Sequence, residues 1–281
     1  MSYKTVVLVI HGMGDTPRNY AEKLEKKLSK KVGSAWPSVY FDSIYYADIF
    51  QKHQKDIFTR IKATDDIDWI ALRKFLLYGF SDAAGLERRA SQAGSPYEQV
   101  QDRILDALDK AYDAAGPNVK IVLMAHSLGC HVISNYIWDV QSKQTQLGAW
   151  REGGFDDSPV GSDLDKFRRL KNLKLLCFTG CNIPIFLAGI PHGKIKAISS
   201  SSKGYSFKWK NFYDPDDPLG WPLKNISTRN IKESFKYEVN EDNAVNVGNL
   251  LNNWNPLSHN NYWSDNDVIN PIADDIKRLI G

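Results

Sequence analysis

The chain has 281 residues and a formal net charge of +3, and 42% of its residues are hydrophobic. This length allows one large α/β domain or two small ones, and the composition is that of an ordinary globular protein. The charge is too small to indicate nucleic acid as a partner, and no stretch approaches the ~20 apolar residues of an integral membrane segment. Cys130, Cys177 and Cys181 match neither a disulfide framework nor a zinc-binding pattern. We therefore expect no metal and no cofactor.

The N-terminal segment predicts a core strand from Lys4 to Ile10 and a glycine-containing turn from His11 to Asp15. Its apolar run is too short for a signal peptide, and no small-residue cleavage site follows, which favours a cytoplasmic location. A helix is expected to begin at Pro17 and to end at Gly33, because apolar residues recur at helical spacing between them. Residues 39–46 predict a second strand, because they are rich in β-branched and aromatic side chains.

Residues 47–95 contain more aromatic and charged residues than a simple connection between strands needs. Their apolar residues predict two amphipathic helices, and the second has an unusually wide apolar face. Two interpretations remain open at this stage. The helices either pack on the core as ordinary connections or form a helical cap over a site.

The most informative stretch lies near the middle of the chain. Residues 121–125 form an apolar run typical of a strand buried on both faces, and a helical pattern follows from residue 128. Ser127 lies at the junction, with Ala125 two residues before it and Gly129 two residues after it. Small residues at these positions allow the sharp strand-to-helix turn that exposes a nucleophilic serine.

Predicted strands and helices continue to alternate after this helix. We expect a polar, Gly-rich surface loop over residues 141–163, a short helix over 163–171, strands over 173–179, 206–213 and 235–239, and a C-terminal helix over 268–280. With no internal repeat, the pattern predicts a single domain, residues 1–281, built on one doubly wound, mostly parallel sheet with helices on both faces.

A nucleophilic serine needs a base that accepts its proton and an acid that orients the base. Where a nucleophilic serine lies at such a turn, the acid comes after it along the chain and the histidine comes after the acid. Of the six histidines, His259 is the one that follows both Ser127 and an acidic turn. That turn holds Asp214, Asp216 and Asp217. We favour Asp217 as the acid, and Asp214 remains the alternative because it lies nearest the end of the preceding strand.

Two backbone N–H groups are candidates for stabilising a developing oxyanion. One belongs to Leu128, the residue after the nucleophile, and the other to Met13, in the turn after the first strand. Gly12 and Gly14 would let this backbone approach a substrate closely.

Together these segments resemble the α/β-hydrolase superfamily, in particular its serine esterases and lipase-like members. The resemblance is carried by residues 11–15, 125–129, Asp217-Pro218 and Ser258-His259 with Tyr262-Trp263, and it covers nearly the whole chain. It implies the α/β-hydrolase fold, Ser127 as nucleophile, His259 as base and Asp217 as acid. It also implies Met13 and Leu128 as oxyanion donors. Ala125 departs from the glycine that usually precedes the serine by two positions.

These observations favour a serine hydrolase that cleaves a carboxylic ester or thioester through an acyl-enzyme. The same triad could serve an acyltransferase or a peptidase, and a non-catalytic binding module on this fold is the third hypothesis. The substrate is expected to be a small molecule with an apolar or aromatic part. Residues expected to contact it are His11, Gly12, Ile183, Phe186 and Trp221.

Overall fold

The computed structural model describes residues 2–64, 68–87, 92–142, 148–190, 195–201, 204–224, 226, 238–248 and 258–281. Within these residues the core is one six-stranded sheet in which every neighbouring pair is parallel. Its strands are β1 (Thr5–Ile10), β2 (Val39–Ile44), β3 (Lys120–His126), β4 (Leu173–Thr179), β5 (Lys208–Tyr213) and β6 (Glu241–Ala244). Their order is β2-β1-β3-β4-β5-β6, so the winding direction reverses between β1 and β3. The predicted doubly wound α/β architecture is confirmed.

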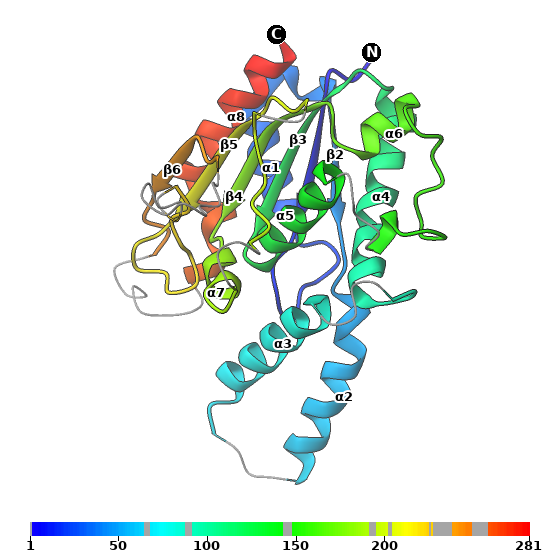
Figure 1. Cartoon of the computed structure of the whole chain (residues 1–281). Coiled ribbons are helices and arrows are strands. Elements are labelled where there is room, and N and C mark those ends of the chain that lie inside the picture. The colour runs from blue at the N-terminus through cyan, green and yellow to red at the C-terminus, as the bar shows by residue number, and fades with distance from the viewer. Residues whose placement is uncertain are drawn as a thin grey trace.

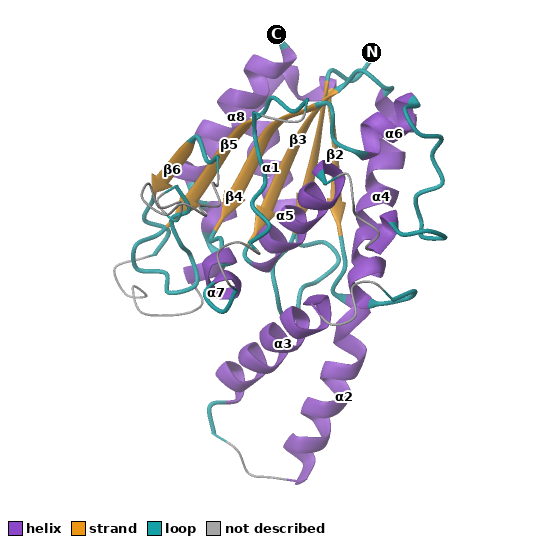
Figure 2. Cartoon of the chain, viewed as in Figure 1, coloured by secondary structure: helices purple, strands orange, loops and turns teal. Residues whose placement is uncertain are grey.

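Helices cover both faces of this sheet (Figure 2). The helices are α1 (Glu22–Val32), α2 (Asp48–Thr64), α3 (Ile70–Glu87), α4 (Pro96–Ala115), α5 (Leu128–Gln141), α6 (Asp163–Arg168), α7 (Ile183–Leu187) and α8 (Asn266–Ile280). Helices α1 and α8 share one apolar core with alternate residues of the central strands, and α4 and α5 share the core on the other face. The apolar runs of β1 and β3 follow from this, because both faces of each strand are buried.

Two predicted elements begin elsewhere than expected. Helix α1 begins at Glu22 and not at Pro17, because the residues between them form tight turns in which the Tyr20 N–H donates to the Pro17 carbonyl at 3.1 Å and the Glu22 N–H donates to the Asn19 carbonyl at 3.2 Å. The strand predicted over residues 235–239 lies partly outside the described residues, and the strand that pairs with β5 is β6. Strand β6 is polar and half-buried, as an edge strand can be, so an apolar pattern could not locate it.

The segment between β2 and α4 forms a helical hairpin, α2 packed on α3. Figure 1 shows this hairpin extending beyond the sheet at the edge where the strand arrows end. Parallel sheets bind ligands at that carboxyl edge, near the point where the winding reverses. The hairpin therefore lies on the same side of the molecule as the expected site. No helix of the described residues combines the length and the apolar character needed to cross a bilayer.

The loop expected to lie on the surface over residues 141–163 is partly buried. Gly148 and Ala149 are buried, and the backbone N–H of Ala149 donates to the side chain of Gln101 on α4 at 2.8 Å. Asp156, farther along the loop, pairs with the buried guanidinium of Arg168 at 3.0 Å. Polar composition predicted exposure, which holds for much of residues 151–161, but hydrogen bonds to Gln101 and Arg168 hold the rest of the loop against the core.

Candidate active site

Ser127 lies between β3 and α5 in a strained backbone conformation, with φ 53° and ψ −124°. A positive φ is rare for a residue with a side chain and persists only where the surroundings hold it. The N–H of Ser127 donates to the Thr179 carbonyl and its own carbonyl accepts from the Cys130 N–H, both at 3.0 Å. A Cβ at Gly129 would collide with the carbonyl oxygen of His11. The small residue is therefore a steric requirement of this turn.

His259 and Asp217 come together from distant loops. His259 Nδ1 lies 2.7 Å from Asp217 Oδ2, and the two residues are only 2% and 4% exposed. His259 lies in a short 3₁₀ turn, Ser258–Asn260, that leads towards α8, whereas Asp217 follows β5. Burial alone would raise the pKa of the Asp217 carboxyl, but the hydrogen bond and the charge of His259 hold that pKa below its ordinary value.

Two further donors and one glycine fix the carboxylate of Asp217. The Tyr262 hydroxyl donates to Asp217 Oδ2 at 2.8 Å, and the Leu219 N–H donates to Oδ1 at 3.0 Å. A Cβ at Gly220 would lie 2.6 Å from both Asp217 Oδ2 and the Tyr262 hydroxyl, so only glycine lets the chain pass here. An ionised carboxylate only accepts, and therefore Nδ1 of His259 carries the ring proton and Nε2 is free to accept.

Asp214, the alternative acid, has other partners. Its Oδ2 accepts from the Val247 N–H at 2.7 Å, and its Oδ1 accepts from the Asp216 N–H at 2.9 Å. These contacts fix the backbone of the turn. The structure thus brings Asp217, and not Asp214, to His259.

Ser127 and His259 face one cleft of about 630 Å³ at the carboxyl ends of β1 and β3, where the winding of the sheet reverses. Ser127 Oγ and His259 Nε2 are both buried, and neither has a hydrogen-bond partner among the described residues. Gly12 lies against the serine, since a Cβ there would be 2.6 Å from Ser127 Cβ. Gly180 lies against the imidazole in the same way, at 2.9 Å from His259 Cε1. An acceptor and a hydroxyl without partners in one cleft are available to a substrate.

The two expected oxyanion donors lie on either side of this serine. Leu128 is the first residue of α5, where the backbone N–H has no acceptor within the helix. Met13 belongs to the turn after β1 and lines the cleft together with Gly12 and Gly14. Met13 is therefore at the cleft, whereas Leu128 is buried next to Ser127 and is not among the described residues that line it.

His11 supports this turn through both of its ring nitrogens. Nδ1 donates to the Gly12 carbonyl at 2.7 Å, and Nε2 accepts from the Tyr46 N–H at 3.1 Å. Burial lowers the pKa of His11 to about 4, so the ring stays neutral near pH 7. His11 lines the cleft as expected, but both of its polar atoms are used by the backbone.

The other expected substrate contacts lie elsewhere. Ile183 is buried in the core, Phe186 packs on the ring of His131 at 4.6 Å between centroids, and Trp221 is exposed. None of the three is among the described residues that line the cleft around Ser127. The apolar wall is supplied instead by Phe75 and Tyr78 of α3.

The remaining lining residues are mostly ones that the sequence did not indicate. They are Asp15, Thr16, Pro17, Asn19, Tyr20, Glu22, Lys23, Lys74, His126, Asn260 and Trp263. Lys74 of α3 is paired with Asp15 at 2.6 Å. The wide apolar face of α3 was the sequence feature that could have indicated the lining residues of this helix, but the sequence did not show what this face contacts.

His126, beside the nucleophile, is a second neutral imidazole at the site. Burial first and then the nearby His259 lower the pKa of His126 to about 3, and its Nδ1 contacts the Thr179 carbonyl at 3.1 Å. The two imidazole rings lie 4.7 Å apart between centroids. Within the described residues, no cluster of three or more His, Cys, Asp or Glu side chains is placed to hold a metal ion.

No protein-family model matches the sequence, and no curated protein matches it either. Among solved structures, the chain is similar to one of an acetylxylan esterase, with 13% sequence identity and a TM-score of 0.43 over 100% of both chains. A similarity this distant does not indicate an activity, so the case for a function depends on the cleft itself.

Proposed function

We propose that this protein is a serine hydrolase that cleaves a carboxylic ester or thioester through an acyl-enzyme. The observation that carries the proposal is the buried pair of His259 and Asp217, 2.7 Å apart, facing the same cleft as a serine held at positive φ. A buried imidazole that is hydrogen-bonded to a carboxylate through one nitrogen, with its other nitrogen left free, is typical of a general base.

In the proposed reaction, His259 Nε2 accepts the hydroxyl proton while Ser127 Oγ attacks the carbonyl carbon. The backbone N–H groups of Leu128 and Met13 stabilise the negative oxygen of the tetrahedral intermediate. Asp217 stabilises the imidazolium that forms. The intermediate collapses, His259 returns the proton to the leaving alcohol or thiol, and water then releases the acyl group by the same steps.

The cleft favours a small substrate with an apolar or aromatic part. Phe75, Tyr78 and Trp263 provide aromatic walls, whereas Lys74 and Asp15 add charge. We also propose that residues 47–95 form a helical cap, because α3 supplies part of this wall. The three cysteines are free and buried, as in a reducing compartment, and this supports the proposed cytoplasmic location.

The first test replaces the nucleophile. Ser127→Ala should lower hydrolysis of a p-nitrophenyl ester by roughly 10³-fold or more, because the hydroxyl that attacks is gone. Ser134→Ala, at another buried serine of α5, is the matched control and should keep wild-type turnover. Undiminished turnover in Ser127→Ala would end the proposal.

Two measurements separate the alternatives that use the same fold. A fluorophosphonate adduct on Ser127 would support a nucleophilic serine, and no adduct would favour a binding module. Product analysis with added alcohols or amines distinguishes a hydrolase from an acyltransferase, and cleavage of a peptide library would identify a peptidase.

A further inference from the structure

The turn after β1 is held in place by the α2–α3 hairpin, on the side away from the sheet. The backbone N–H of Gly14 donates to Asp82 Oδ2 of α3 at 3.1 Å. The side-chain amide of Gln51 on α2 donates to the carbonyls of Gly14 and Thr16 at 3.4 and 3.3 Å. Gly14 has φ +102°, a conformation that leaves its N–H and carbonyl available to these partners.

Asp82 is an unusual residue for such a contact, because its carboxyl is only 3% exposed and no cation pairs with it among the described residues. Its second oxygen, Oδ1, accepts from the side-chain amide of Gln54 on α2 in a short hydrogen bond. The same amide also donates to Ser81 Oγ at 2.8 Å. A buried carboxylate is costly unless donors satisfy it, and here the donors are the Gly14 N–H and the Gln54 amide.

Burial raises the pKa of the Asp82 carboxyl to about 6, although the hydrogen bonds from Gly14 and Gln54 act in the opposite direction. A neutral residue at this position would avoid the cost of a buried charge. The carboxylate offers two acceptor oxygens at once, one for α2 and one for the turn, which an amide does not.

The residues on either side of Gly14 also contact α3. Met13 packs its sulfur against Gly79, where a Cβ would collide with it. Asp15 pairs with Lys74 at 2.6 Å. Three successive residues of the turn are therefore held by one helix, and the middle contact is the only one of the three made by the turn's backbone.

We propose that Asp82 is a positioning residue for the oxyanion turn: it fixes the Gly14 backbone, and thereby the N–H of Met13, through the chain of contacts Gln54–Asp82–Gly14. The inference rests on the proposed function, because the Met13 N–H has a catalytic task only in an acyl-transfer site. It assigns the α2–α3 hairpin a role in the rate of reaction as well as in substrate binding.

The test is Asp82→Asn. Asparagine keeps the size of the side chain, but it turns one acceptor oxygen into a donor that faces the amide of Gln54 or the N–H of Gly14. We expect kcat for a p-nitrophenyl ester to fall about 10- to 100-fold, below the ~10²–10³-fold cost of deleting an oxyanion donor. KM should change less than about threefold, because the donor matters most in the transition state.

A second variant restores the contact between α2 and α3 and the acceptor for Gly14, and gives up only the hydrogen bond from Gln54 to the Tyr78 carbonyl at 3.3 Å. When Gln54→Glu is combined with Asp82→Asn, the new carboxylate on α2 accepts from the new amide on α3. The amide oxygen on α3 is then again free to accept from the Gly14 N–H. We expect most of kcat to return. Loss of packing alone would not be rescued in this way.

Asp139→Asn is the matched control, because Asp139 is a buried carboxylate of α5 that accepts from Tyr97 and Gln101 and does not line the cleft. It should lower the thermal midpoint and leave kcat unchanged. Hydrogen exchange of the Gly14 amide is an independent measurement that needs no activity. We expect that amide to exchange faster in Asp82→Asn and at the wild-type rate in Asp139→Asn.

The outcomes are distinct. If the wild-type protein neither hydrolyses esters nor forms a Ser127 adduct, the proposed function has failed. If the wild-type protein is active and Asp82→Asn keeps its kcat, or if the double variant recovers nothing, the role of Asp82 is overturned and the hydrolase proposal stands. Unchanged exchange at Gly14 would also overturn it.

Discussion

Asp214 and Asp217 lie three residues apart in one turn, yet their carboxylates have different partners. Asp217 faces His259 and Tyr262, whereas Asp214 accepts from the backbone of Asp216 and Val247. The Asp217 carboxylate can orient a base, whereas the Asp214 carboxylate can only hold the backbone of the turn. The pair therefore allows a direct comparison within one loop.

We expect Asp217→Asn to lower kcat for ester hydrolysis by about 10³- to 10⁴-fold, because an amide can neither stabilise the imidazolium nor enforce the tautomer of His259. Asp214→Asn should keep kcat within about threefold and reduce the free energy of unfolding by about 1–3 kcal/mol, since one backbone N–H loses its acceptor. Steady-state kinetics and urea unfolding of both variants test this. Equal losses of kcat would contradict the assignment.

Much of this residue-scale arrangement could be predicted. Ser127 was located by the small residues around it, and His259 by its order along the chain. The acid remained ambiguous, because both candidates follow the same strand and a sequence does not say which way a carboxylate points. Tyr262 was noted as part of the resemblance, but its hydrogen bond to the Asp217 carboxylate was not predicted.

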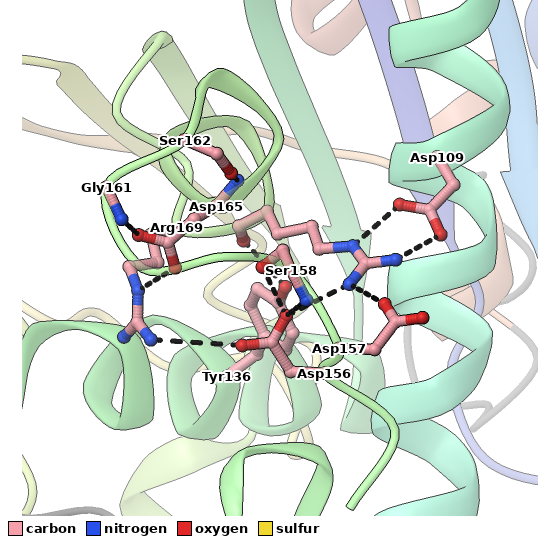
Figure 3. A network of polar contacts seen from close by, with 10 residues as sticks. Asp109, Tyr136, Asp156, Asp157, Ser158, Gly161, Ser162, Asp165 and Arg169 are labelled. Atoms are coloured by element: carbon pink, nitrogen blue, oxygen red, sulfur yellow. Dashed lines mark hydrogen bonds and ion pairs between the residues drawn. The ribbon is translucent and has the colours of Figure 1, made fainter.

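At the scale of elements, a buried arginine joins α6, α4 and the loop before α6 (Figure 3). Arg168 makes a two-pronged contact with Asp109 of α4, at 2.8 Å for both hydrogen bonds. It also donates to Asp156 and Asp157 of the loop at 3.0 and 2.8 Å. The hydrogen bonds to these three carboxylates, that to Asp109 most of all, raise the pKa of the guanidinium further above its ordinary value.

We expect Arg168→Met to reduce the free energy of unfolding by about 3 kcal/mol, because Asp156, whose side chain is 12% exposed, loses the guanidinium at 3.0 Å and keeps only the more distant one of Arg169 at 3.9 Å, while Asp109 and Asp157 reach solvent. Lys166→Met, on the same helix but 57% exposed, is the control and should change it by less than about 0.5 kcal/mol. Urea unfolding measures both. Esterase activity of folded Arg168→Met should equal that of wild type, and a loss below about 1 kcal/mol would contradict the role of the network.

For the α2–α3 hairpin, the apolar pattern predicted the helices but not what they contact. Its two helices were predicted, but a wide apolar face was compatible both with packing on the core, the favoured interpretation, and with a cap. In the structure α3 divides that face. Phe75 and Tyr78 line the cleft, whereas Phe80 on the same helix is 67% exposed and Trp69, just before the helix, is 75% exposed.

For the molecule as a whole, buried groups couple stability to pH in opposite directions. His11 and His126 have pKa values lowered from 6.5 to about 4 and about 3, so the unfolded chain takes up protons first as the pH falls below 6.5. Stability from these histidines is thus lost on acidification. Asp82 acts the other way, because its pKa is raised from 3.8 to about 6 and the folded protein takes up that proton first.

Comparison of wild type with Asp82→Asn should isolate the contribution of the Asp82 carboxylate to the pH dependence of stability. The difference in free energy of unfolding, wild type minus variant, should shift in favour of wild type by about 2 kcal/mol between pH 7 and pH 4, from 1.36 kcal/mol per pKa unit. Urea unfolding of both proteins at the two pH values measures it. A difference that is constant with pH would show that Asp82 does not titrate differently in the folded protein.

The sequence by itself determined the α/β architecture, the strand-to-helix turn at Ser127 and the candidate base His259, because hydrophobic periodicity, small residues and chain order are properties of short segments. Only the tertiary structure decided that Asp217 meets His259, that α3 lines the cleft, and that Ile183, Phe186 and Trp221 lie outside it. Those contacts join residues far apart in the chain, and they depend on how the elements pack.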